Sequence, residues 1–270
     1  MSSNKNRIIN IISNKNYKSK QTTELLSKQL KNKGFIIPDK YSNNAELNIC
    51  VGGDGAFLRA VHRNSFPKIP FVGINTGNLG FFQEILPENI DEFIDHYINK
   101  EYYMEEIFLV EGKITTQDKT FFITGINEIV IKHFKSKVIH LEVFIDDNHL
   151  ERFSGDGVIV STPVGSTAYN FSSGGTIVYP SLKTLQLTPL SPISSKAYRS
   201  LPNSIIVPGD IIISIRPEFR YTNSTLVISD GIDIKYNNIK SIDLKISDKL
   251  LYRLNFHKDM YWNNLKSKFL

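Results

Sequence analysis

The sequence predicts an α/β N-terminal domain built on a parallel sheet, followed by a β-rich C-terminal domain. Over the first hundred residues, short apolar runs alternate with segments of helical periodicity, which is the pattern of a parallel α/β sheet. After about residue 104 the apolar period changes to two, which is typical of strands. We therefore expect an α/β domain at residues 1–104, a β-rich domain at 105–256 and a helical tail at 257–270.

The elements of the first domain follow from local patterns. Apolar runs predict strands at 7–13, 47–51 and 71–74. Thr22 or Thr23 is expected to cap a helix that ends before Gly34. Pro87 opens another helix, whose acidic first turn and terminal Lys100 suit the helix dipole.

In the second domain, apolar residues at every second position predict antiparallel strands. The alternating segments are 139–145, 211–216, 241–246 and 250–256, and they are separated by turn signals such as Asp230-Gly231. The segment 186–199 is rich in Pro, Ser and Thr and is expected to be irregular.

Composition and charge exclude several classes of protein. Lys and Arg number 32 against 27 Asp and Glu, but the excess of +5 is scattered, so we expect no nucleic-acid partner. The single cysteine, Cys50, excludes a disulfide framework and a cysteine-based zinc site. The N-terminus lacks a signal-peptide pattern, and no apolar run reaches the ~18 residues of a membrane span. The expectation is a cytoplasmic protein without a membrane partner.

The first motif is Gly52-Gly53-Asp54-Gly55, between an expected strand and an expected helix. Glycines let backbone N–H groups approach phosphate oxygens, and a helix N-terminus adds a positive dipole. Asp54 in such a turn can act as a general base for a hydroxyl nucleophile or help to hold a divalent cation. The structural alternative is a tight turn in which Asp54 caps the helix.

The second motif runs from Gly155 to Asn170 and is dense in small polar residues, which allow close approach to a ligand. Tyr169 offers a ring that could cover a planar base, and the neighbouring hydroxyl and amide groups offer hydrogen bonds. The alternative is a packed turn with Tyr169 in the core.

The third motif is Asn127-Glu128, an acid within an apolar β run. A buried carboxylate needs a partner, and a ribose diol would be one. The alternative is a strand end that faces water.

Taken together, these segments resemble the NAD kinase family. The resemblance rests on residues 52–55, 73–81, 127–128 and 155–170, in the family's order and approximate spacing, with weaker likeness at 186–188 and 198–199. It covers the chain from about Leu47 to Asp230. It implies a Rossmann-like first domain to which the C-terminal tail returns.

The resemblance also implies the reaction and the site. ATP would phosphorylate the 2′-hydroxyl of the adenosine ribose of NAD, with Asp54 as the catalytic base and a divalent cation, magnesium, as cofactor. Asn127 and Glu128 would bind adenosine, Asp156 would bind the nicotinamide end, and Ser191 would reach NAD across a subunit interface. The remaining expected NAD- and ATP-binding residues are Gly53, Gly55, Asn75, Phe81, Ser154, Thr167, Ala168, Tyr169, Asn170 and Ser172.

The resemblance implies a homo-oligomer, a homotetramer or homodimer, with NAD and ATP as its ligands. Among the departures from the family's pattern, Ala56 stands where many relatives have Thr, and Ser154 where some have Arg. A lipid or sugar kinase of the same fold group, or a catalytically inactive NAD(P)-binding sensor, remain the alternative functions.

Overall fold

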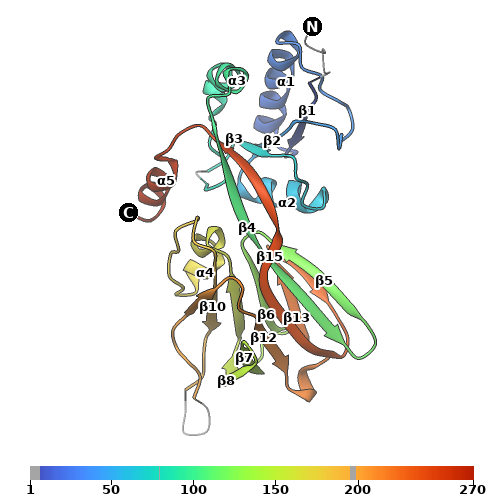
Figure 1. Cartoon of the computed structure of the whole chain (residues 1–270), viewed down its shortest axis with the longest axis vertical. Coiled ribbons are helices and arrows are strands. Elements are labelled where there is room, and N and C mark those ends of the chain that lie inside the picture. Colours follow the sequence, from blue (N-terminus) through green and yellow to red (C-terminus); the bar gives the residue numbers. More distant parts are fainter. Residues whose placement is uncertain (1–6, 79, 195–198) are drawn as a thin grey trace. The chain divides into compact units, whose positions relative to one another are not determined.

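The computed structural model describes residues 7–78, 80–194 and 199–270 (Figure 1). The chain divides into two compact units, Met1–Glu106 with Leu251–Leu270, and Ile107–Leu250. The chain passes from one unit to the other inside two long strands, β4 (Tyr103–Thr116) and β15 (Ile239–Asn255), and not through loops.

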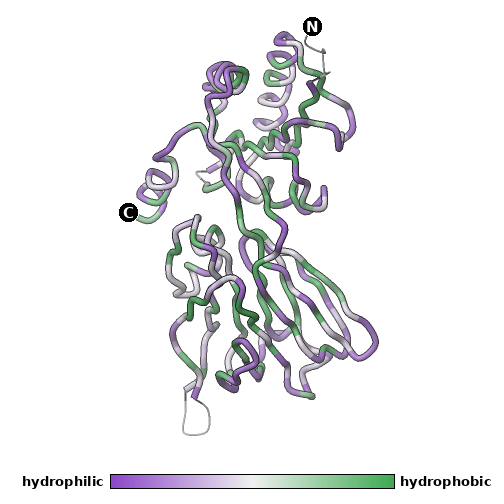
Figure 2. Tube along the Cα trace, viewed as in Figure 1, coloured by the Kyte–Doolittle hydropathy of each residue, from purple (hydrophilic) through white to green (hydrophobic). Residues whose placement is uncertain are grey.

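The first unit is α/β, as expected. Its strands β1 (Ile9–Ser13), β2 (Leu47–Gly52) and β3 (Phe71–Asn75) pair in parallel, and Arg253 of β15 pairs in parallel with Phe71. The strands β1, β2 and β3 are largely hydrophobic in Figure 2, which fits a sheet buried beneath helices. The helices of this unit are α1 (Tyr17–Asn32), α2 (Asp54–Arg63), α3 (Ile90–Asn99) and α5 (Met260–Phe269).

The N-terminal cap of α1 differs from the expectation. Asn16 is the cap, and its side-chain oxygen accepts a hydrogen bond from the Ser19 N–H at 2.8 Å. Thr22 lies inside the helix and donates its hydroxyl to the Lys18 carbonyl. The helix therefore begins before the apolar residues that signalled it, because a polar first turn carries no apolar periodicity. Gly34 follows the helix with φ +87°, as expected of a residue just past a helix end.

The second unit consists of two antiparallel layers around one apolar core. One layer has the order β11-β10-β9-β6-β13-β14, and the other contains β5, β4, β15, β12, β7 and β8. The bounds in chain order are β5 (Thr120–Gly125), β6 (Glu128–His133), β7 (Ile139–Ile145), β8 (Asn148–Gly155), β9 (Gly157–Ser161), α4 (Tyr169–Ser172), β10 (Thr184–Leu190), β11 (Ile205–Pro208), β12 (Ile213–Pro217), β13 (Thr225–Ser229) and β14 (Ile232–Lys235).

One expectation for this unit is wrong. The start of segment 186–199 is not irregular, because Gln186–Leu190 forms most of β10, which pairs with β9 and β11. Its polar side chains satisfy a neighbouring loop: Gln186 bonds the Thr176 backbone in both directions, and Thr188 donates to Asn170. Polar composition therefore misled the local prediction at a buried strand. Tyr198 lies outside the described residues.

None of the helices in the described part of the chain combines the length and the apolar character that crossing a membrane requires.

Candidate active site

Asp54 is the first residue of α2, directly after the buried strand β2. Gly53 is the N-terminal cap residue, and no side chain caps the helix. The alternative in which Asp54 caps α2 is therefore not observed. The half-buried carboxylate instead turns to the loop that follows β3.

Two backbone N–H groups hold the Asp54 carboxylate. Phe81 N–H donates to Oδ2 at 2.9 Å and Phe82 N–H donates to Oδ1 at 3.0 Å. Gly80 permits this approach, since a Cβ at residue 80 would lie 2.5 Å from Asp54 Cγ. Each carboxylate oxygen keeps a further lone pair, so the group can still accept a proton.

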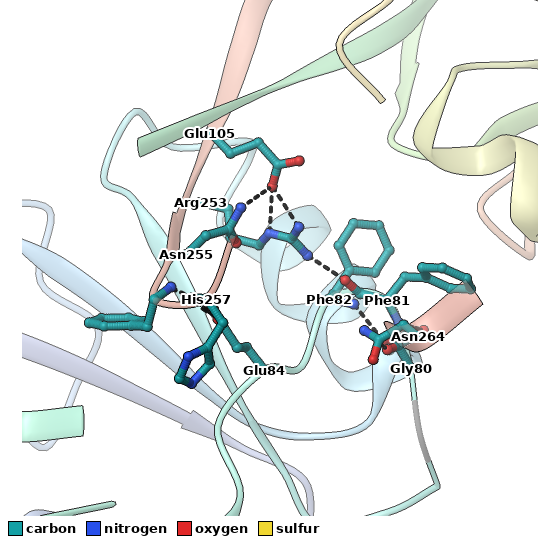
Figure 3. A network of polar contacts seen from close by, with 11 residues as sticks. Gly80, Phe81, Phe82, Glu84, Glu105, Arg253, Asn255, His257 and Asn264 are labelled. Atoms are coloured by element: carbon teal, nitrogen blue, oxygen red, sulfur yellow. Dashed lines mark hydrogen bonds and ion pairs between the residues drawn. The ribbon is translucent and has the colours of Figure 1, made fainter. Parts of the chain in front are cut away.

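Side chains from the end of the chain bind the carbonyl groups of the same loop (Figure 3). Asn264 of α5 donates to the Gly80 carbonyl at 2.9 Å, and Arg253 donates to the Phe81 carbonyl. Arg253 is fixed in turn by Glu105, whose Oε2 lies 2.6 Å from Arg253 Nη2. The Phe81 ring lies beside α5, 6.1 Å from the Phe269 ring centroid.

Asn75 ends β3 and is buried. Its side-chain oxygen accepts a hydrogen bond from the Gly77 N–H at 2.9 Å, and its amide donates to the Asn78 carbonyl. Asn75 therefore shapes the start of the loop whose end binds Asp54. Leu79 of this motif lies outside the described residues.

In the second unit, Glu128 opens β6 and is only 6% exposed, so it does not face water. Burial, with a smaller contribution from the Asp230 carboxylate, raises the pKa of Glu128 to about 8, although the Tyr169 backbone N–H opposes the shift. Glu128 Oε2 and Asn127 Oδ1 are buried and make no hydrogen bond. Unpaired buried polar atoms are costly, so this pair suits a polar ligand.

The turn at Asp230-Gly231 is the expected hairpin between β13 and β14. It also holds the backbone of Asn127 and Glu128 in place. The Asp230 carboxylate accepts hydrogen bonds from the backbone N–H groups of Ile126, Asn127 and Glu128, at 2.7, 2.7 and 3.2 Å. In the sequence, Asp230 signals only the turn. Asp230 lies 102 residues after Glu128 in the sequence, so no local pattern indicated that the two are in contact.

The segment Thr162–Asn170 is locked to the Asn127 backbone. The Thr162 hydroxyl donates to the Ile126 carbonyl at 2.6 Å, and the Thr162 N–H donates to the Asn127 carbonyl at 2.9 Å. A Cβ at Gly165 would lie 2.5 Å from Asn127 Cα, so glycine is needed for this contact. The small residues here thus bring two parts of the backbone together.

The expected ligand residues of this segment differ in exposure. Tyr169 is 44% exposed, and the core alternative is wrong for it. Asn170 is fully buried, and its amide bonds the Ser166 carbonyl and the Thr188 hydroxyl, which makes it a support for the loop. Ser172 is exposed, Ala168 is partly exposed, and Thr167 is buried with its hydroxyl on the Val164 carbonyl.

Asp156, Tyr169 and Ser191 line one cavity of about 260 Å³ in the second unit. Leu190, the end of β6 and the loop after it form the rest of the wall; β6 contributes Lys132, and the loop contributes Lys135 and Lys137. These three lysines lie within six consecutive residues and give this wall of the cavity a positive charge. Such a wall favours an anionic ligand.

Ser154 does not line this cavity. It is fully buried, and its hydroxyl lies 2.6 Å from Nδ1 of His140. A contact between Ser154 and a ligand stays a prediction.

Comparisons with known proteins agree with these motifs. The N-terminal domain of the ATP-NAD kinase family matches residues 8–102, and its C-terminal domain matches residues 126–251. The chain is 49% identical to an NAD kinase of Finegoldia magna, over 99% of both chains. It is 31% identical to an NAD kinase of Staphylococcus carnosus, over 97% of both.

Solved structures show the same fold at lower identity. The yeast NADH kinase complexed with NADH superposes with a TM-score of 0.85 at 20% identity, over 98% of this chain and 88% of that one. An NAD kinase from Archaeoglobus fulgidus in complex with ATP gives 0.77 at 23% identity, over 97% and 98%. With both domain matches and close relatives along its whole length, the chain belongs to the ATP-NAD kinase family.

Proposed function

We propose that this chain is an NAD kinase that transfers the γ-phosphoryl group of ATP to the 2′-hydroxyl of the adenosine ribose of NAD. The observation that carries the proposal is Asp54, a carboxylate oriented by two backbone N–H groups at the start of α2. The identity of the substrates is inferred from the family to which the chain belongs and from its NAD kinase relatives. The ATP complex of the Archaeoglobus fulgidus relative supports ATP as the donor.

The proposed step needs one base and a precise alignment of the 2′-hydroxyl with the γ-phosphoryl group. The 2′-oxygen attacks the γ-phosphorus, its proton passes to Asp54, and the bond from the γ-phosphorus to the β–γ bridging oxygen breaks to release ADP. Phosphoryl transfer depends mainly on alignment and on stabilising the charge of the transferring group. The N–H groups at the start of α2 suit that charge.

In the second unit, the buried Asn127-Glu128 pair is proposed to bind the adenosine part of NAD, since both residues have an unpaired polar atom. A protonated Glu128 would donate a hydrogen bond and a charged one would accept it. Tyr169, half exposed, is proposed to cover a planar ring. Asp156 and Ser191, beside the lysine-rich wall, are proposed to contact the nicotinamide end and the diphosphate.

Magnesium is proposed to arrive with the phosphates of ATP. Among residues 7–78, 80–194 and 199–270, no cluster of three His, Cys, Asp or Glu residues could hold a metal ion by itself. One carboxylate plus substrate phosphates is a common magnesium environment, and Asp54 supplies that carboxylate. The cation would neutralise charge on the phosphates. A cytoplasmic location and a homotetramer or homodimer stay predictions.

The test is direct. The purified chain is incubated with NAD, ATP and Mg²⁺, and NADP is measured with a dehydrogenase specific for it. Asp54→Asn keeps the shape of the side chain and removes its basicity, so kcat should fall by ~10² or more while NAD still binds. Asp39→Asn, at an exposed position, is the matched control.

Each outcome has a clear meaning. An Asp54→Asn variant with near-normal turnover would contradict the assignment of the base. A wild-type chain that binds NAD but forms no NADP would indicate the inactive sensor. A chain that phosphorylates a lipid or sugar but not NAD would indicate the other kinase class.

A further inference from the structure

The two N–H groups that hold Asp54 belong to consecutive peptide groups. The first joins Gly80 to Phe81, and its N–H donates to Asp54 Oδ2. The second joins Phe81 to Phe82, and its N–H donates to Oδ1. The orientation of the Asp54 carboxylate thus depends on the orientation of these two peptide planes.

Each peptide group also accepts a hydrogen bond at its carbonyl end. Asn264 Nδ2 donates to the Gly80 carbonyl at 2.9 Å, and Arg253 Nη1 donates to the Phe81 carbonyl (Figure 3). Two chains of hydrogen bonds result, one starting at Asn264 and one at Arg253. Each passes through a planar peptide group to one oxygen of the Asp54 carboxylate. A donor at a carbonyl polarises the same amide, so its N–H becomes a stronger donor.

Burial distinguishes Asn264 from the rest of its helix. Asn264 is 7% exposed and is the only buried residue of α5, whereas the aromatic Trp262 is 47% exposed. An apolar side chain would be the ordinary choice for the most buried position of a surface helix. The buried amide is explained by its bond to Gly80.

Arg253 is held just as firmly. It is 9% exposed, and Glu105 Oε2 accepts from Arg253 Nε at 2.8 Å and from Asn255 Nδ2 at 3.0 Å. This pairing leaves Nη1 directed at the Phe81 carbonyl. Because both donors come from residues 253–264, the end of the chain controls a carboxylate near its beginning.

We propose that Asn264 is a positioning residue for the phosphoryl transfer: through the Gly80–Phe81 peptide group it orients the carboxylate of Asp54, in parallel with Arg253. The proposal rests on the proposed function, since it concerns the rate of that reaction. Because Asn264 acts on the Gly80 carbonyl, its loss should lower kcat and leave substrate binding unchanged.

The experiment compares Asn264→Ala with Asn263→Ala, the adjacent and exposed asparagine of α5. We expect Asn264→Ala to lower kcat about tenfold and to change KM for NAD and for ATP by less than about twofold, because small misalignment costs rate more than affinity. Asn263→Ala should behave as wild type. Asn264→Asp keeps the side-chain size and removes the NH₂ donor, so it should show the same loss even if the alanine variant folds poorly.

A double variant tests whether Asn264 acts through Asp54. In the Asp54→Asn background, Asn264→Ala should lower the residual kcat by less than about twofold, because the group being oriented is gone. An unchanged kcat in Asn264→Asp and Asn264→Ala would overturn the proposal. So would an equal tenfold loss in both backgrounds, or a loss that appears in KM.

A second readout does not depend on activity. Hydrogen exchange at the Phe81 and Phe82 amides should accelerate in Asn264→Ala and not in Asn263→Ala, because the peptide planes lose an anchor. If wild type makes no NADP, the proposed function fails and exchange still tests the positioning. If wild type is active and exchange is unchanged, the positioning inference alone fails.

Discussion

Gly80→Ala is the sharpest test of how the loop after β3 serves Asp54. A Cβ at residue 80 would lie 2.5 Å from Asp54 Cγ and 2.6 Å from Oδ2, whereas ordinary contacts begin at 3.4 Å. The carboxylate or the loop must therefore move by about 1 Å. A displacement of that size at a reacting group costs ~10² in rate, equivalent to about 2.7 kcal/mol of transition-state stabilisation.

The assay is steady-state formation of NADP, with the folded fraction checked by thermal unfolding. We expect Gly80→Ala to lower kcat ~10²-fold while NAD binding measured by calorimetry persists. Gly77→Ala is the matched control, since a Cβ there meets no atom within 4 Å. If Gly80→Ala retains wild-type kcat, or if Gly77→Ala loses as much, the close approach of residue 80 to Asp54 does not matter for the reaction.

Two further predictions concern the second unit. Burial raises the pKa of Glu128 from 4.5 to about 8, so the folded state holds a proton that the unfolded state releases, and this group lowers stability as pH rises from about 4.5 to about 8. Glu128→Gln should therefore raise the unfolding temperature more at pH 8 than at pH 5; an equal change at both pH values would refute the assignment. Ile193 is half-buried and lies close to Ser191, in the segment where a subunit contact is expected. Ile193→Asp replaces this apolar side chain with a charge, which should weaken both self-association and NAD affinity. Sedimentation and NAD titration of the same variant would decide, and dissociation with unchanged affinity would contradict a shared site.

Much of the fold was predictable because periodicity reports which face of an element is buried. Apolar runs located β1, β2 and β3, and period-two alternation located strands such as β7 and β12. The cap at Asn16 and the strand β10 were missed. In both places a polar side chain has a specific partner, and periodicity does not report hydrogen bonds.

The long strand β15 shows a further limit of local patterns. Its two alternating segments, 241–246 and 250–256, predicted separate strands, but the structure joins them into one strand that extends across both units. The hydrophobic pattern specifies which residues face inward. It does not specify where a strand breaks, since pairing with β12 and with β3 keeps the backbone extended.

For the candidate site, the sequence by itself determined the residue types and their order. It contained the glycine-rich turn with Asp54, the Asn127-Glu128 pair and the small-residue segment ending in Asn170. These are local motifs, because glycine at a close approach and a carboxylate beside a turn are properties of neighbours in the chain. They were sufficient to indicate the family.

Only the tertiary structure decided what surrounds those motifs. It paired Asp54 with the N–H groups of Phe81 and Phe82, and set Asp230 under the backbone of Asn127-Glu128. It buried Asn170 as a support and brought Asn264 to Gly80, 184 residues away. Hydrogen bonds between distant residues leave no periodic trace in the sequence, because each depends on where the whole chain has already placed both partners.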